Sequence, residues 1–329
     1  MTHALVAIPT LNEEHTIAAV LSDLLSDCHA FPIVVFDGGS SDRTCDIVHR
    51  FARQHARVSL RRNPQRTQAH AINAAAHLAQ TLGAQVLVRV DAHARYPKGF
   101  VNALVRLVQD ERADSVVTPL IATDQRDPWA QASALLQRSW LGNGGALHRN
   151  AAKSGWVGHG HHAAFRLAAF RALGGYDTSF SANEDAEYDH RLIKAGGRIF
   201  LAGHLPVRYC PRATPHDVFR QYWRNGFWRM RMLRHHRRRP ALRQLLPIVA
   251  TVTCPLSLAL GWIWFPFTIP ALAYLGALAM LAARAAGLAP RTGLRIIWLG
   301  ILMHFGFGLG SLAALRIRSA TSTISQAAA

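Results

Sequence analysis

Acidic residues follow two apolar runs in the first half of the chain, and their side chains are the groups best suited to chemistry. Asp37 follows the run 32–36 and opens a Gly-Gly-Ser turn. Asp91 follows the run 86–90 and stands two residues before His93. A carboxylate at such a position can bind a ribose, a base edge or a metal ion, and a nearby imidazole favours manganese or another transition metal over magnesium. Taken alone, each motif can equally be a capped turn.

A further acidic pair, Glu184 and Asp185, precedes an expected helix over 186–195. Asp185 can remove a proton from an attacking hydroxyl if it lies within hydrogen-bond reach. Glu184 beside it would raise the pKa of that base through like-charge repulsion. The alternative is that the two acids simply begin a helix, where negative charge is favourable.

A histidine cluster, His159, His161 and His162, lies in a glycine-rich stretch over 142–160 and just beyond it, which we expect to be a loop. A zinc site is one interpretation of the cluster, but no cysteine or acid stands at ligand spacing nearby. A loop on the acceptor side of an active site is the favoured interpretation.

Strand and helix signals alternate along this part of the chain. We expect strands near 5–8, 32–36, 58–60, 86–90, 116–121 and 199–201, with helical periodicity between them. Such alternation predicts an α/β fold, a Rossmann-like and mainly parallel sheet with helices on both faces. In open sheets of this kind, ligands bind at the carboxyl ends of the strands. The acids at 37 and 91 should therefore meet at one edge.

Four motifs occur together in a fixed order, and together they are far more specific than any one of them. They are Ile8-Pro-Thr-Leu-Asn-Glu-Glu14, Val35-Phe-Asp-Gly-Gly-Ser-Ser-Asp-Arg-Thr44, Val90-Asp-Ala-His-Ala-Arg-Tyr-Pro97 and Asn183-Glu-Asp185. This set resembles the family 2 glycosyltransferases, which have a GT-A fold. More narrowly, it resembles the exopolysaccharide glycosyltransferases of the succinoglycan-biosynthesis type, over roughly residues 4 to 230.

The resemblance implies roles for individual residues. The nucleotide-sugar would lie against Pro9, Leu11, Glu13, Asp37, Arg66 and Asp91. Asp91 and His93 would hold a divalent metal, Mn²⁺ or Mg²⁺, and Asp185 would be the catalytic base. The acceptor side would include Glu184, Gln221, Trp223 and Arg224. The chain departs from the family pattern where His93 replaces an acid and where Asn225 replaces a tryptophan, and the second departure argues against a processive synthase.

Positive charge is concentrated before the apolar C-terminal part. The formal net charge is +18, and nine arginines lie between Arg220 and Arg243. This pattern is typical of a cytoplasmic flank at an anionic membrane surface. A nucleic-acid patch is the competing interpretation, but no DNA- or RNA-binding motif supports it.

Residues 246–283 carry no charge, which predicts helices near 246–264 and 268–284, and a third apolar stretch follows at 296–315. An interfacial or re-entrant segment is the alternative to three spans. The first residues do not resemble a signal peptide, and the four cysteines suggest no disulfide framework. We therefore expect a cytoplasmic GT-A domain over 1–230, a basic juxtamembrane segment over 231–245, a membrane domain over 246–318 and a tail over 319–329.

These features predict a multi-pass protein of the bacterial inner membrane, with its catalytic domain facing the cytoplasm. The function that the family resemblance implies is inverting transfer of a sugar, glucose as the expected one, from a UDP-sugar to a glycan carried by an undecaprenyl-type lipid. This step would belong to the synthesis of an exopolysaccharide or cell-surface polysaccharide. Two alternatives remain. One is a polyprenyl-phosphate glycosyltransferase, and the other is a non-catalytic, membrane-anchored scaffold that binds a nucleotide-sugar.

Overall fold

The computed structural model describes residues 4–27, 31–123, 127–139, 142, 153–212, 214–286 and 289–316. The chain divides into two compact units. The first comprises Met1–Thr123 and Gly145–Cys210, and the second comprises Asp124–Gly144 and Pro211–Ala329. This division differs from the expected domain boundary at 230, because the helix over 215–235 packs with the C-terminal helices.

The first unit is built around an eight-stranded sheet with the order β3-β2-β1-β4-β9-β6-β10-β8. The pairs β1–β2, β2–β3, β1–β4 and β6–β10 are parallel, whereas β9 is antiparallel to both of its neighbours and β8 is antiparallel to β10. The sheet is therefore mainly parallel, as predicted. Its strands are β1 (Ala4–Thr10), β2 (Ile33–Asp37), β3 (Val58–Arg62), β4 (Val86–Arg89), β6 (Ser115–Thr118), β8 (Gly155–Val157), β9 (His161–Arg166) and β10 (Ile199–Leu201).

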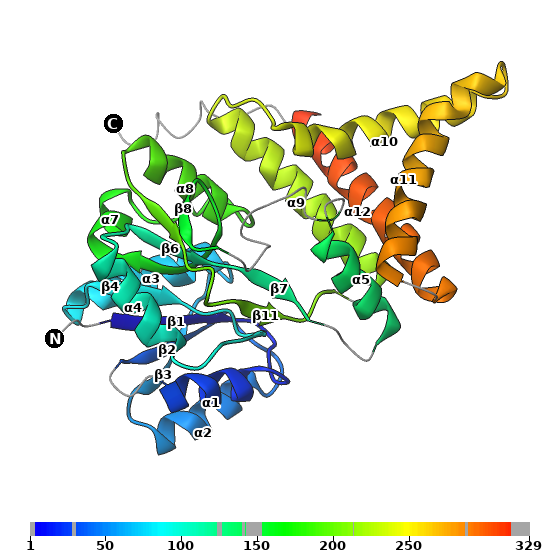
Figure 1. The fold of residues 1–329 in the computed structure, drawn as a ribbon. Helices are drawn as coiled ribbons and strands as arrows, with labels where there is room; N and C mark the ends of the chain where they lie inside the picture. Colours follow the sequence, from blue (N-terminus) through cyan, green and yellow to red (C-terminus); the bar gives the residue numbers. More distant parts are fainter. Residues whose placement is uncertain are drawn as a thin grey trace. The chain divides into compact units, whose positions relative to one another are not determined.

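Helices cover both faces of this sheet (Figure 1). On β1, the buried side chains of Val6 and Ile8 pack with α1, α2 and α4, whereas Leu5 and Ala7 pack with α3, α7 and α8. Because both faces are buried, β1 is an uninterrupted apolar run instead of an alternating one. The helices are α1 (Ile17–Asp27), α2 (Thr44–Gln54), α3 (Gln68–Thr81), α4 (Phe100–Asp110), α7 (Leu167–Ala172) and α8 (Glu184–Lys194).

The strand expected over 116–121 is two strands in two sheets. Pro119 separates β6 from β7 (Leu120–Ala122), because proline has no N–H to donate to a strand pair. Its carbonyl accepts the N–H of Val207 at 2.8 Å. This bond leads into a second, three-stranded sheet of order β5-β11-β7, in which β5 is Ala94–Arg95 and β11 is Val207–Tyr209.

The stretch over 142–160, expected to be a loop, contains strand β8. Trp156 of β8 packs edge-on against Phe200 of β10, with ring centroids 5.3 Å apart. The loop prediction is therefore wrong for 155–157. Residues 143–152 lie outside the described part of the chain.

The second unit is helical. Three of its helical segments, Leu242–Leu260, Phe265–Ala285 and Pro290–Arg316, are long and apolar enough to cross a membrane, as predicted. The tail expected over 319–329 lies outside the described residues. The elements of this unit are α5 (Pro128–Arg138), α9 (Pro215–His235), α10 (Leu242–Leu260), the 3₁₀ helix η2 (Phe265–Thr268), α11 (Ile269–Ala286) and α12 (Pro290–Arg316).

Small residues bring α9 and α12 into close contact. A Cβ at Gly306 would lie 2.8 Å from the carbonyl oxygen of Phe219, and one at Gly310 would collide with the carbonyl oxygen of Trp223. The hydroxyl of Ser311 donates to the carbonyl of Gly226 at 3.2 Å. Glycines four residues apart let two helix backbones approach closely, as in many packed membrane helices.

This contact makes Gly310→Ala an informative substitution. The added methyl group must push α9 away from α12, and we expect a loss of about 1–3 kcal/mol in the free energy of unfolding. Thermal unfolding in detergent measures the effect. Gly276→Ala in α11 is the matched control, because nothing lies within 4 Å of its Cβ position. Equal melting temperatures for the two variants would contradict this account of the packing.

Candidate active site

Asp37 ends β2 beside the end of β1, where it is paired in register with Thr10. Its carboxylate accepts the N–H of Gly39 at 2.8 Å, the N–H of Ser40 at 3.0 Å and the hydroxyl of Ser40. Burial alone would raise the pKa of Asp37, but these hydrogen bonds outweigh it and lower the pKa. The side chain is therefore an ionised acceptor in a fixed orientation.

The loop after β1 is fastened to the turn after β2. Glu13 donates its N–H to the hydroxyl of Thr44 at 2.8 Å, and the side-chain oxygen of Asn12 accepts the N–H of Ser41 at 2.8 Å. The Glu13 carboxylate lies 3.0 Å from Nδ1 of His93. The fold thus brings Glu13 and His93 together although they are far apart in sequence.

Arg66 closes over the same turn. It adopts a left-handed backbone conformation with φ of 60°. Its guanidinium donates to the carbonyls of Gly38 at 2.9 Å and Gly39 at 3.3 Å. Pro9 is half-buried at the end of β1, and Leu11, just beyond it, has 43% of its surface exposed. The residues below position 70 that are predicted to contact the nucleotide therefore lie at the adjacent ends of β1 and β2 and on the turn that Arg66 covers.

Asp91 follows β4 and is enclosed by polar partners. Gln68 Nε2 lies 3.1 Å and Arg89 Nε 3.3 Å from its Oδ1, and His161 Nε2 lies 3.0 Å from its Oδ2. Burial alone would raise the pKa of Asp91, but the charges of Arg89 and His161 hold it well below its ordinary value. His93, the expected partner of Asp91, lies 3.0 Å from the Glu13 carboxylate and also contributes to the lowered pKa of Asp91. The imidazole that contacts Asp91 comes from β9.

Arg89 joins the two acidic motifs. Its side chain is only 5% exposed, donates to the hydroxyl of Tyr176 at 3.1 Å and lies 3.7 Å from a carboxylate oxygen of Glu184. Burial, followed by the charge of Asp185, raises the pKa of Glu184. Asp185 is half-buried in the first turn of α8. One buried cation therefore links the aspartate after β4 to the acidic pair that begins α8.

Sequence reasoning missed Arg89 and did not foresee the contact between His161 and Asp91. Arg89 had a detectable signal, because it is the one charged residue in the apolar run 86–90. The contact of His161 depends on the register of β9 and had no such signal. The predicted acceptor-side residues Gln221, Trp223 and Arg224 lie on α9 of the second unit, where the ring of Trp223 stacks on Phe227 at 5.4 Å.

The donor set around Asp91 is compatible with a divalent cation. Among the described residues, no group of three His, Cys, Asp or Glu side chains is arranged to hold a metal. Asp91 and His161 nevertheless offer an ionised carboxylate beside an imidazole, a pairing that suits manganese. Mg²⁺ and similar ions often take one or two protein ligands and complete their shell with substrate phosphates and water.

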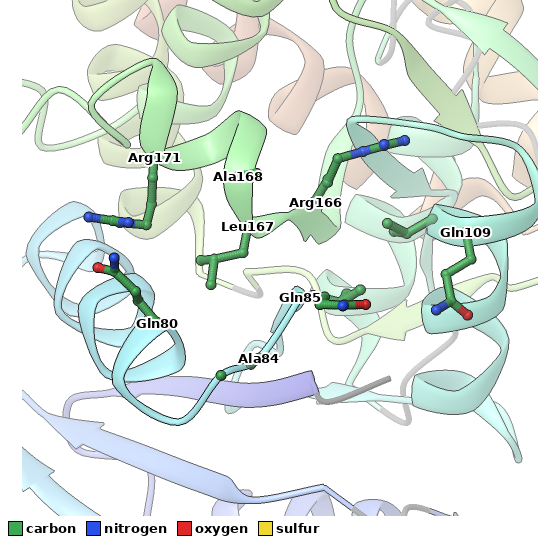
Figure 2. Close-up of a pocket in the computed structure, with 11 residues that line it drawn as sticks. Gln80, Ala84, Gln85, Gln109, Arg166, Leu167, Ala168 and Arg171 are labelled. Carbon is green, nitrogen blue, oxygen red and sulfur yellow. The ribbon is translucent and has the colours of Figure 1, made fainter. Parts of the chain in front are cut away.

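A cavity of about 470 Å³ lies in the first unit, away from these residues (Figure 2). It is lined at the start of β4, where Gln85 lies, and at the end of the antiparallel β9, where Arg166 lies. Gln80 at the end of α3, Gln109 at the end of α4 and Arg171 of α7 add further polar side chains to the lining. These positions mark the sheet edge opposite the strand ends that carry Asp37 and Asp91, so the cavity contains none of the predicted site residues.

Three comparisons with known proteins bear on this geometry. The succinoglycan biosynthesis protein ExoA of Rhizobium meliloti is 43% identical over 251 residues, which cover 75% of each chain. Among solved structures, the mannosyltransferase PcManGT of Pyrobaculum calidifontis, in complex with GDP-Man and Mn²⁺, superposes with a TM-score of 0.58 at 21% identity, covering 95% of this chain and 87% of the other. S. aureus TarS, residues 1–349, gives 0.52 at 12% identity, covering 95% and 91%.

The structural neighbours share the GT-A fold predicted for the first unit: a mainly parallel central sheet with helices on both faces. Residues 5–174 match the family model for glycosyl transferase family 2. That range contains Asp37, Asp91 and the strands that carry them, and the identity to the Rhizobium protein extends the match over most of the chain. The chain therefore belongs to the family 2 glycosyltransferases.

Proposed function

We propose that the chain is an inverting glycosyltransferase that moves a sugar from a UDP-sugar to a lipid-linked glycan in exopolysaccharide biosynthesis. Glucose is the sugar we propose, on the precedent of the family. The name of the 43% identical relative, a succinoglycan biosynthesis protein, supports the biosynthetic role. The observation that carries the reaction type is the buried side chain of Arg89, which joins Asp91 to Glu184 beside Asp185.

The nucleotide is proposed to bind at the adjacent ends of β1 and β2. Asp37 is ionised and oriented by its backbone turn, so it can accept hydrogen bonds from the uracil or the ribose. Pro9, Leu11 and Glu13 would surround the base. Arg66 would lie near the diphosphate, since its guanidinium already sits on the turn after Asp37.

Asp91 is proposed to hold a divalent ion, Mn²⁺ or Mg²⁺, together with the donor diphosphate. The second protein group would be His161, which contacts Asp91, or His93, which the family motif favours. When bound, such an ion stabilises the negative charge of the leaving diphosphate. The mannosyltransferase that shares the fold was solved with GDP-Man and Mn²⁺, which supports this assignment.

Asp185 is proposed to accept the proton of the acceptor hydroxyl as that oxygen attacks the anomeric carbon. A single direct displacement inverts the configuration at this carbon. Glu184 is buried, with its pKa raised by burial and by Asp185, and it lies against Arg89. Its burial and its contact with Arg89 suit it to holding the cluster together.

The acceptor is proposed to be carried by an undecaprenyl-type lipid in the bacterial inner membrane, with the catalytic unit facing the cytoplasm. The three apolar helices support membrane attachment, and the arginines of α9 suit an anionic lipid surface. Gln221, Trp223 and Arg224 on α9 are proposed to act on the acceptor side.

Metal removal tests the proposed donor chemistry. Purified protein in bacterial lipid extract is incubated with a panel of UDP- and GDP-sugars, and nucleotide release is measured with Mn²⁺, with Mg²⁺ and with EDTA. We expect release from one UDP-sugar, reduced at least about a hundredfold by EDTA and restored by Mn²⁺. Full activity in EDTA would overturn the metal assignment, and silence across the panel without nucleotide binding would overturn the proposed function.

A further inference from the structure

A second histidine of the glycine-rich stretch is held by a buried carboxylate. His159 Nδ1 lies 2.6 Å from Oδ2 of Asp189, and the side chain of Asp189 is only 1% exposed. The N–H of Gly160 donates to the same oxygen at 3.3 Å. A carboxylate that is buried and doubly hydrogen-bonded fixes both the position and the orientation of an imidazole ring.

Each member of the pair is close in sequence to a residue of one acidic motif or its partner. His161, two residues after His159, contacts Asp91. Asp189 is four residues after Asp185 on α8, which places the two acids on the same helix face, one turn apart. The ring of His159 is 25% exposed, so a ligand can reach it.

We propose that His159 is an acceptor-binding residue that accepts a hydrogen bond from a hydroxyl of the acceptor sugar, and that Asp189 is the positioning residue that fixes its ring. This inference rests on the proposed function. The nucleotide side of the site is formed at the ends of β1 and β2, whereas His159 is fastened to α8, the helix that carries the proposed base. The group nearest to that base in the reaction is the acceptor.

The carboxylate also determines which hydrogen bond the ring can make. In the neutral ring, a hydrogen bond from Nδ1–H to Asp189 leaves Nε2 without a proton, as a hydrogen-bond acceptor. Sugar hydroxyls are donors, so they match this nitrogen. The competing explanation is a purely structural latch that holds the segment before β9 on α8.

Asp189→Asn separates these explanations, because its amide can donate to Nδ1 and move the ring proton to Nε2, which then no longer accepts. The acceptor probes are octyl β-glucoside, octyl β-galactoside and bacterial lipid extract, with the UDP-sugar that the wild type hydrolyses. We expect Asp189→Asn and His159→Gln each to raise the acceptor KM about tenfold. The donor KM and hydrolysis without acceptor should stay within about twofold, and the double variant should resemble the single ones.

The matched control is His204→Gln, since His204 is an exposed histidine of the same unit that also has a side-chain partner, Ser154. It should leave both KM values unchanged. An unchanged acceptor KM in His159→Gln would overturn the proposal. The proposal would also be overturned if the donor KM and the acceptor KM both rose and the melting temperature fell. That result would support the purely structural latch.

A readout independent of turnover is histidine-labelled ¹⁵N NMR. The His159 signals should shift on addition of the octyl glycoside that is transferred, and Asp189→Asn should reverse their tautomer pattern. Absence of any shift at saturating glycoside would also overturn the proposal. If the wild type releases no nucleotide from any UDP-sugar, the proposed function itself fails. If nucleotide release is normal but the variants bind the acceptor as the wild type does, only the role of His159 fails.

Discussion

Replacement of Asp185 by asparagine should lower turnover by about 10²- to 10⁴-fold while leaving donor binding intact. Asparagine has nearly the same shape, and its side-chain oxygen can still accept the N–H of Ala186, as Asp185 does at 2.7 Å. It cannot take a proton from the acceptor hydroxyl. Sugar transfer is measured at saturating UDP-sugar, and nucleotide affinity is measured by calorimetry.

The control for this variant is Asp46→Asn. Asp46 is an exposed acid in the first turn of α2, so its removal costs a similar favourable charge at a helix start. Its turnover should equal that of the wild type. If Asp185→Asn retained full turnover with an unchanged melting temperature, another group would have to be the base.

Replacement of Arg89 by methionine should cost about 3–5 kcal/mol in the free energy of unfolding. Methionine fills much of the same space, but it removes the cation between the buried Glu184 and the partly buried Asp91, and Asp91 keeps His161 as a partner. The loss should shrink as the pH falls. Glu184, whose pKa is already raised, then takes up a proton and loses its uncompensated charge. Denaturant unfolding at several pH values measures both effects.

Two further variants check the cause of that loss. Adding Glu184→Gln to Arg89→Met should recover part of the lost free energy, because one unpaired charge is removed. Arg95→Met is the matched surface control, since Arg95 pairs with Asp23 at 3.0 Å but is 62% exposed. It should cost no more than about 1 kcal/mol. Equal losses for the two arginines would contradict the assignment of Arg89 as the buried link.

Three parallel strands, β1, β2 and β4, could be predicted because they are buried on both faces. Such strands are mainly apolar runs, as over 4–9 and 33–36, and they stand out in the sequence. Strand β9 did not stand out. Its sequence, His161-His-Ala-Ala-Phe-Arg166, has no β-branched residue and no clear alternation, yet it lies in the middle of the sheet between β4 and β6. Its position is determined by tertiary pairing and not by local propensity.

The candidate site could be predicted where its residues lie at the end of a strand or at the start of a helix. Asp37 and Asp91 follow apolar runs, and Asp185 opens a helix, so their positions follow from the elements. Their partners do not. The contact of His161 with Asp91 depends on the register of an antiparallel strand that crosses a parallel sheet, and the position of Arg89 against Glu184 depends on where α8 packs.

The discontinuity of the second unit has a consequence for how the protein is made. Helix α5 precedes the segment Gly145–Cys210 of the first unit in the chain, yet its residues Ala132 and Leu136 are buried in a cluster with Ile296 and Met303 of α12. During synthesis, α5 leaves the ribosome long before α12 is translated. Its apolar face therefore stays exposed while β9 and β10 are added to the sheet. A nascent chain at that stage presents a hydrophobic helix that a chaperone or the membrane surface can bind. Helix α12, which is translated after the whole of the first unit, supplies much of the surface that covers this face.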